Sequence, residues 1–128
     1  MKNSYALVTG ATSGIGLEIS RDLAKRGYNL VLVARTKERL SEISKELIKE
    51  YNIKCDYFSS DLTLINSPEE IYQFTSQKQY RIEILVNNAG YALPKAFHLN
   101  SMEDEEKCLR VLGTSVIALT KKYINDMI

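Results

Sequence analysis

The chain has 128 residues, with 17 Lys or Arg, 16 Asp or Glu and a formal net charge of +1. This length suits one domain with a buried core, and the interspersed charges argue against a surface for nucleic acid. No apolar run approaches the roughly 18 residues that cross a membrane, so we expect no membrane association.

The two cysteines, Cys55 and Cys108, lie far apart and outside any metal-binding or redox motif. The chain also enters its first predicted strand almost at once, which leaves no room for a signal peptide. Both features predict a cytoplasmic protein with free thiols. A His-rich metal site is excluded because His98 is the only histidine.

The first predicted elements are an apolar strand at residues 5–8 and a helix at residues 17–25. The spacing of Ile15, Ile19 and Leu23 predicts that these three side chains form the apolar face of the helix. Such a strand-to-helix transition exposes the first unpaired N–H groups of the helix and its positive dipole end, which together attract a phosphate.

A glycine-rich run, Thr9-Gly10-Ala11-Thr12-Ser13-Gly14-Ile15-Gly16, joins that strand to that helix. We expect Gly10 to permit the tight turn, Gly14 to leave space for a ligand beside the backbone, and Gly16 to let helix and strand pack closely. Thr12 and Ser13 add hydroxyl donors at the same place. A glycine-rich surface turn without a ligand is the alternative.

A second apolar run follows at residues 30–34, after Gly27 ends the first helix. Its unbroken apolarity is typical of a parallel strand covered on both faces, which predicts a βαβ unit. Arg35 follows this strand, at a position where NAD-binding units carry an acidic residue. A guanidinium there favours the 2′-phosphate of NADP. An exposed arginine in a loop is the alternative.

An amphipathic helix is predicted at residues 37–51, with Asn52 as its stop. Its buried stripe consists of Leu40, Ile43, Leu47 and Tyr51. A third strand is predicted around Tyr57 and Phe58, and Ser60-Asp61-Leu62 follows it. From the residues alone, Asp61 is equally well a turn or capping residue.

The next helix is predicted to begin with Ser67 as N-cap, Pro68 at the first position and Glu70 completing a capping box. Ile71 and Phe74 are expected to face inward. A fourth strand at residues 82–86 then ends in the run Asn87-Asn88-Ala89-Gly90.

The last predicted helix follows a loop at residues 91–100 and begins at Ser101, with Asp104 three residues later. We expect it to be one continuous helix with an apolar stripe. The stripe consists of Leu109, Leu112, Val116, Leu119, Tyr123 and Met127.

Two motifs in this order, Thr-Gly-x-x-x-Gly-x-Gly at residues 9–16 and Asn-Asn-Ala-Gly at residues 87–90, resemble those of the short-chain dehydrogenase/reductase family. The resemblance runs along the whole chain but covers only about the first half of the family's length. It implies a doubly wound (Rossmann) α/β fold with a mostly parallel sheet in strand order 3-2-1-4. It also implies hydride transfer between NADP(H) and an alcohol or carbonyl compound.

The resemblance further implies where the cofactor lies. Asp61 and Leu62 would flank the adenine, Arg35 would hold the 2′-phosphate, and residues 87–90 would lie at the ribose and brace the neighbouring loops. The cofactor-binding residues predicted in this way are Gly10, Thr12, Ser13, Gly14, Ile15, Gly16, Arg35, Asp61, Leu62, Asn87, Asn88, Ala89 and Gly90.

Two departures from the family pattern concern catalysis. The family's relay asparagine falls on Leu112, which cannot bind a water and is expected simply to pack. The family's serine and Tyr-x-x-x-Lys pair would follow the last helix, beyond Ile128. The one Tyr-x-x-x-Lys present joins Tyr91 to Lys95 through a loop with Pro94, and we interpret it as coincidental.

We therefore expect residues 1–128 to form a single NADP-binding domain that is incomplete at its C-terminus, lacks catalytic residues and is inactive alone. A carbonyl or alcohol substrate is expected only if the C-terminal half is supplied. One alternative is a non-catalytic NADP-binding module or a subunit completed by another chain. Another is a homo-oligomer in which copies pair through the open edge of the fourth strand.

Overall fold

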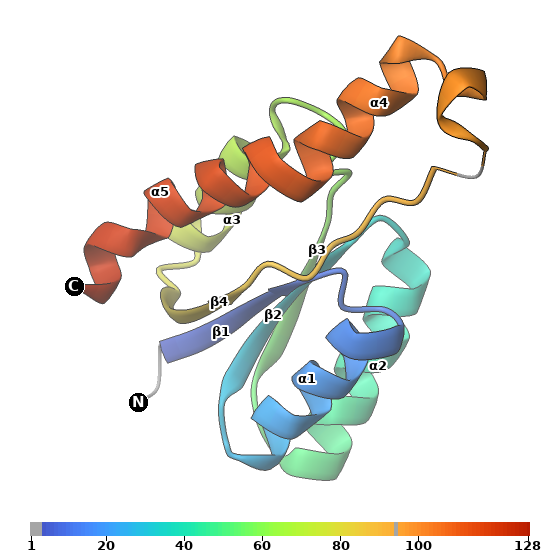
Figure 1. Ribbon diagram of the computed structural model, residues 1–128. Helices are drawn as coiled ribbons and strands as arrows, with labels where there is room; N and C mark the ends of the chain where they lie inside the picture. Colours follow the sequence, from blue (N-terminus) through green and yellow to red (C-terminus); the bar gives the residue numbers. More distant parts are fainter. Residues whose placement is uncertain (1–3, 94) are drawn as a thin grey trace.

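A computed structural model describes residues 4–93 and 95–128, and its centre is a parallel four-stranded sheet (Figure 1). The strands are β1 (Ser4–Thr9), β2 (Asn29–Ala34), β3 (Cys55–Ser59) and β4 (Arg81–Val86), in the order β3-β2-β1-β4. Every neighbouring pair is parallel. The predicted doubly wound fold and its strand order are confirmed.

Helices cover both faces of the sheet (Figure 1). One face carries α1 (Gly14–Lys25) and α2 (Lys37–Tyr51), and the other carries α3 (Ser67–Gln77) and α5 (Ser115–Met127). Between β4 and α5 come the short 3₁₀ helix η1 (Phe97–Leu99), α4 (Met102–Leu109) and the π-helical turn η2 (Arg110–Thr114). Among the described residues, no helix is both long enough and apolar enough to cross a membrane.

The two central strands alternate between the two cores. Ala6 and Val8 of β1 pack with α1 and α2, whereas Tyr5 and Leu7 pack with α3 and α5. All four side chains are at most 3% exposed. Both faces of the strand therefore need apolar residues, which explains the unbroken apolar runs.

The predicted helix ends at Gly27 and Asn52 are confirmed. Gly27 has a φ of 92°, and the amide of Tyr28 donates to the carbonyl of Leu23 at 3.1 Å, as in a Schellman cap. Asn52 ends α2 with a φ of 55°. These residues tolerate the left-handed conformation that closes a helix.

The predicted apolar face of α1 forms, since Ile15, Ile19 and Leu23 line one hollow together, but most of this face does not pack on the sheet. Ile15 is 72% exposed and Ile19 is half-buried, and of the three only the half-buried Leu23 also packs against the core. The residues buried against the sheet are Gly16, Leu17, Ser20 and Ala24. Three of these four are small, because the start of α1 packs closely on the turn before it and leaves little space there.

The predicted capping box at Ser67 is wrong. Asn66 occupies the N-cap position of α3, without a side-chain capping bond, and Pro68 lies in the first turn as expected. Ser67 is fully buried, and its hydroxyl forms a hydrogen bond with the hydroxyl of Ser60 instead. The Ser67 side chain that was expected to cap α3 therefore bonds to Ser60, a residue outside the helix.

The last helix starts as predicted, since the hydroxyl of Ser101 accepts from the amide of Asp104 at 3.0 Å. It is not continuous, however, because η2 interrupts it. The π turn carries more residues per turn than an α-helix and so shifts which positions face the sheet. The buried residues are Val111, Ser115, Leu119 and Tyr123, whereas Leu112 is 55% exposed and does not pack as expected.

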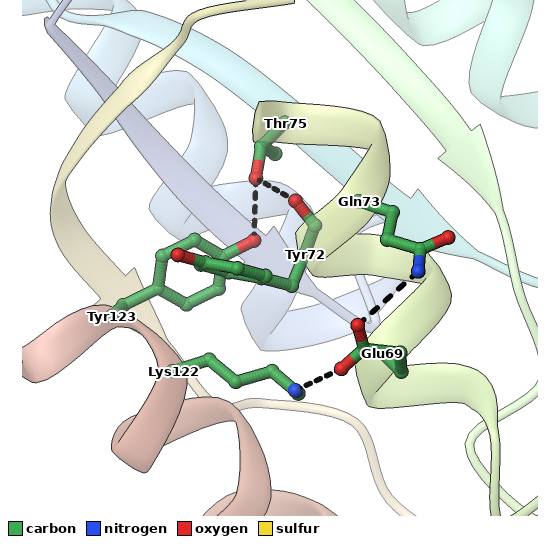
Figure 2. A network of polar contacts seen from close by, with 6 residues as sticks. All are labelled: Glu69, Tyr72, Gln73, Thr75, Lys122 and Tyr123. Atoms are coloured by element: carbon green, nitrogen blue, oxygen red, sulfur yellow. Dashed lines mark hydrogen bonds and ion pairs between the residues drawn. The ribbon is translucent and has the colours of Figure 1, made fainter. Parts of the chain in front are cut away.

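A polar network fastens α5 to α3 (Figure 2). The hydroxyls of Thr75 and Tyr123 are hydrogen-bonded at 2.7 Å, and the ring of Tyr72 contacts that of Tyr123 edge-on at a centroid distance of 5.3 Å. Lys122 forms an ion pair with Glu69 and lies over the Tyr72 ring. These contacts hold the final helix over the β4 side of the sheet.

Candidate functional site

A cleft of about 340 Å³ opens where the loops after all four strands meet the segment η2. Ligands of open α/β sheets bind at this edge, where successive strands connect to opposite faces. The residues lining the cleft are Gly10, Thr12, Ser13, Val33, Ala34, Arg35, Thr36, Ser60, Asp61, Leu62, Thr63, Asn88, Ala89, Gly90, Tyr91 and Val111.

The turn between β1 and α1 is packed too closely for side chains at two of its glycines. A Cβ on Gly16 would lie 2.1 Å from the carbonyl oxygen of Gly10, so the helix start rests directly on the turn. Gly10 itself has a φ of +62°, and a Cβ there would lie 2.9 Å from the Cα of Ala89. The close packing expected of Gly16 is confirmed.

The first backbone amides of α1 receive no capping hydrogen bond from the side chain of the N-cap residue, Ser13. Ser13 is extended there, with φ −158° and ψ 165°, and its side chain makes no capping hydrogen bond. Around Gly14, the space that a Cβ would occupy has no heavy atom within 4 Å. The positive end of the helix is therefore accessible beside the cleft.

Two side chains fasten the β1 turn to the β4 turn. The hydroxyl of Thr9 accepts hydrogen bonds from the amides of Asn88 and Ala89, both at 3.0 Å. In return, the side-chain amide of Asn88 donates to the carbonyl of Gly10 at 3.2 Å. Thr9 is 1% exposed and was not predicted as a site residue, because only a long-range contact reveals its role.

Arg35 lies exposed at the end of β2, on the wall of the cleft. Its carbonyl accepts from the hydroxyl of Ser59 at 2.7 Å, which holds the backbone at this position. Within residues 4–93 and 95–128, no carboxylate forms an ion pair with it. A cation at the rim that is not held in a contact ion pair by the described residues is available to an anionic ligand.

Asp61 closes the turn after β3 and also lines the cleft. Its carboxylate accepts from the amide and the hydroxyl of Thr63, at 2.9 and 2.7 Å. Burial raises the pKa of Asp61, but these two hydrogen bonds and the charges of Arg35 and Lys107 outweigh burial and lower that pKa. Asp61 is thus a turn residue with a lowered pKa, as the alternative interpretation of the sequence predicted, and it also lines the cleft.

The far wall of the cleft comes from η2 and the segment after β4. Val111 is 4% exposed and lines the cleft, whereas its neighbour Leu112 does not. Tyr91 lines the cleft too, and its carbonyl accepts a weak bond from the thiol of Cys108 at 3.8 Å. Lys95 is exposed and does not line the cleft. Pro94, between them, lies outside the described residues.

Nine of the predicted site residues line this cleft: they are Gly10, Thr12, Ser13, Arg35, Asp61, Leu62, Asn88, Ala89 and Gly90. The other four do not. Gly14 and Ile15 open α1 and line a shallow hollow on its outer face, while Gly16 is buried on the side of the helix that packs on the turn. Asn87 points to α5, where its side-chain amide donates to the hydroxyl of Thr120 at 3.4 Å.

Sequence reasoning missed seven lining residues, namely Val33, Ala34, Thr36, Ser60, Thr63, Tyr91 and Val111. Five of them, all except Val33 and Val111, are immediate chain neighbours of predicted site residues and could have been included for that reason, and Val33 lies two positions before Arg35. Val111 could not, because η2 alters the helical phase that brings it to the cleft. Among the described residues, no group of three or more His, Cys, Asp or Glu side chains is arranged to hold a metal ion.

Known proteins provide an independent comparison. The family model for short chain dehydrogenase matches residues 4–128. A fatty acyl-CoA reductase from Acinetobacter baylyi is 32% identical over 130 positions, spanning 100% of this chain and 44% of the relative.

Solved structures agree with that match. A bulky-bulky ketone specific alcohol dehydrogenase from Comamonas testosteroni is 30% identical with a TM-score of 0.88, over 98% of this chain and 50% of its own. A short-chain dehydrogenase from Sphingobium yanoikuyae in complex with NADPH is 32% identical with a TM-score of 0.86, over 94% of this chain and 46% of its own. The chain thus spans about half the length, or less, of the proteins it matches.

Proposed function

Because the chain belongs to the short-chain dehydrogenase/reductase family, we propose that its cleft binds NADP(H) as the cofactor-binding part of an oxidoreductase. The reaction would be hydride transfer between NADP(H) and an alcohol or carbonyl compound. The observation that carries the proposal is the open start of α1 beside a cleft with an unpaired arginine at its rim. Those two features match the two phosphate-bearing parts of NADP.

The residues present fit such a ligand. Gly10 and Gly16 bring the helix start against the turn, where any side chain would fill the space, and Gly14 leaves room beside the backbone. The amides at residues 14–16 would hold the pyrophosphate, helped by the hydroxyls of Thr12 and Ser13. This arrangement favours a ligand with a diphosphate over one without.

The remaining contacts follow from the ends of the strands. Arg35 would bind the 2′-phosphate, Asp61 and Leu62 would flank the adenine, and residues 88–90 would lie at the cofactor's ribose, while the side chain of Asn87 bonds to Thr120 instead. When bound, NADPH supplies a hydride to a carbonyl carbon. This chain's own residues bind and orient the ligand, and Thr9 and Asn88 keep the two central turns together.

A second candidate function is a non-catalytic NADP-binding module. It is favoured by Leu112, which stands where the family resemblance implies a relay asparagine and is 55% exposed. Leucine has no polar atom in its side chain to hold a water or pass a proton. On either candidate, we expect the purified 128-residue chain to show no reductase turnover with carbonyl compounds, and measured NADPH consumption would contradict this.

The binding proposal is tested by titrating the chain into NADPH and following the nicotinamide fluorescence. We expect a dissociation constant of about 1 μM. Arg35→Ala should weaken binding about tenfold to a hundredfold, because it removes charge-assisted hydrogen bonds to the 2′-phosphate. Arg39→Ala is the matched control, since Arg39 lies on α2 and pairs with Glu42 at 3.3 Å. Equal affinity for NADPH and NADH would contradict the preference for NADP.

A further inference from the structure

One side chain joins the helical wall of the cleft to the turn after β3. The guanidinium of Arg110, the first residue of η2, donates to the carbonyl of Thr63 at 2.8 Å. The two residues are 47 positions apart in the chain. In Figure 1 the loop after β3 passes close to the α4–α5 segment in this view, and the hydrogen bond shows that the two are in contact.

The turn that Arg110 contacts is closed by its own short-range bonds. Asp61 accepts from Thr63 through its carboxylate, and the carbonyl of Asp61 accepts from the amide of Leu64 at 3.0 Å. Next to it, the amide of Ser60 donates to the carbonyl of Ala34 at 2.9 Å. These bonds shape the turn and tie its start to β2, but they do not link it to the opposite wall.

The opposite wall packs against the same turn. Leu62 and Val111 are 7% and 4% exposed, belong to one apolar cluster and both line the cleft. The helical wall therefore meets the turn after β3 in two ways. Arg110 makes a polar contact with the turn, and its neighbour Val111 shares an apolar cluster with Leu62. Among the described residues, no carboxylate forms an ion pair with Arg110 that would compete for its guanidinium.

We propose that Arg110 is a positioning residue for the adenine end of the cleft. By holding the Thr63 carbonyl, it sets the separation between the turn at Asp61 and Leu62 and the wall at Val111. The part of the cleft lined by this turn is the place that the proposed NADP(H) function assigns to the adenine, so the ligand role of Arg110 rests on that function. A charged donor to a carbonyl is strong enough to fix such a turn.

The first test needs no ligand. In Arg110→Met, which keeps a long apolar stem, we expect the backbone amides of residues 61–64 to exchange hydrogen about tenfold faster than in the wild type. Arg110→Lys should restore part of the protection, because an ammonium still donates, but without the planar fork. Arg26→Met is the matched control, since Arg26 is exposed and pairs with Asp22 at 2.9 Å on the outer side of α1.

The second test uses adenosine 2′,5′-bisphosphate, which carries the adenine and the 2′-phosphate without the nicotinamide. We expect its affinity, measured by calorimetry, to fall about tenfold in Arg110→Met, to recover partly in Arg110→Lys and to stay unchanged in Arg26→Met. Unchanged exchange at residues 61–64 in Arg110→Met would overturn the positioning role. Unchanged affinity alongside faster exchange would overturn the link to the adenine. Failure of the wild type to bind the bisphosphate would instead overturn the proposed function, and the exchange data would still decide whether Arg110 holds the turn.

Discussion

Helices α1 and α4 both begin after a serine, and the two serines behave differently. Ser101 caps α4 with its hydroxyl, and three acidic residues, Glu103, Asp104 and Glu105, fill the first turn. Ser13 makes no such bond, and the first turn of α1 holds no acidic residue. Helix α4 therefore neutralises its own positive end, whereas α1 leaves its positive end uncapped.

On the proposed function, the difference means that α1 keeps a phosphate site open at a cost in local stability. A capping hydroxyl or a first-turn carboxylate would stabilise α1 in the free chain, but it would occupy the groups that a phosphate needs. The glycines of the β1–α1 turn hold that open start in place by packing.

The largest expected effect comes from disturbing the packing beneath α1. Gly16→Ala places a Cβ 2.1 Å from the carbonyl oxygen of Gly10 in the present geometry. We expect the free energy of unfolding, measured in urea, to fall by about 3 kcal/mol or more. Gly113→Ala is the matched control, because a Cβ at Gly113 meets no heavy atom within 4 Å. Similar stability losses in the two variants would contradict the packing role of Gly16.

A smaller, pH-dependent effect on the free energy of unfolding is expected from Tyr123, which anchors α5 to α3 through Thr75. Burial raises the pKa of Tyr123 to about 12 from its ordinary 10.0, although its hydrogen bond to Thr75 opposes the rise. The unfolded chain loses this proton first as pH rises, so the stability from this group is complete below pH 10 and is lost toward pH 12.

The matching experiment compares the wild type with Tyr123→Phe across that range. In the wild type this group contributes a fall in unfolding free energy of about 1.4 kcal/mol per pH unit, and Tyr123→Phe should lack that part of the slope. Tyr28→Phe, which alters a half-buried tyrosine next to the cap of α1, is the control. If the free energy of unfolding falls equally steeply with pH in the wild type and in Tyr123→Phe, the folded-state pKa of Tyr123 is not raised.

The smallest effects separate the two serines directly. Ser101→Ala should lower the free energy of unfolding by about 1 kcal/mol, because the amide of Asp104 loses its acceptor. Ser13→Ala should change it by less than about 0.5 kcal/mol without ligand. Thermal or urea unfolding of both variants would measure this, and a larger loss in Ser13→Ala than in Ser101→Ala would invert the comparison.

Local signals in the sequence predicted much of this fold. The correctly predicted features depend on residues within a few positions of one another. They are the bounds of α2, the left-handed helix ends at Gly27 and Asn52, and the cap at Ser101. The strand order followed from the family resemblance together with unbroken apolar runs. Nine of the thirteen predicted site residues line one cleft, because the glycine turn and the strand ends mark the same edge of the sheet.

The failures have two other causes, which are contacts outside the predicted element and an irregular helical turn. The hydroxyl of Ser67 bonds to Ser60 instead of capping α3, and Thr9 gains its role from amides near residue 88. The π turn at η2 has no signal in a pattern of 3.6 residues per turn, so the exposure of Leu112 was missed. The contact of Arg110 with Thr63 is likewise invisible to spacing rules.

The open positive end of α1 is tested most directly by amide resonances in nuclear magnetic resonance spectra of the isotope-labelled chain. On addition of NADPH, we expect the amides of Gly14, Ile15 and Gly16 to shift strongly, while those at the capped start of α4, residues 102–104, stay unchanged. If the amides of residues 14–16 do not move while NADPH is bound, or those of α4 move more, the ligand does not rest on the start of α1.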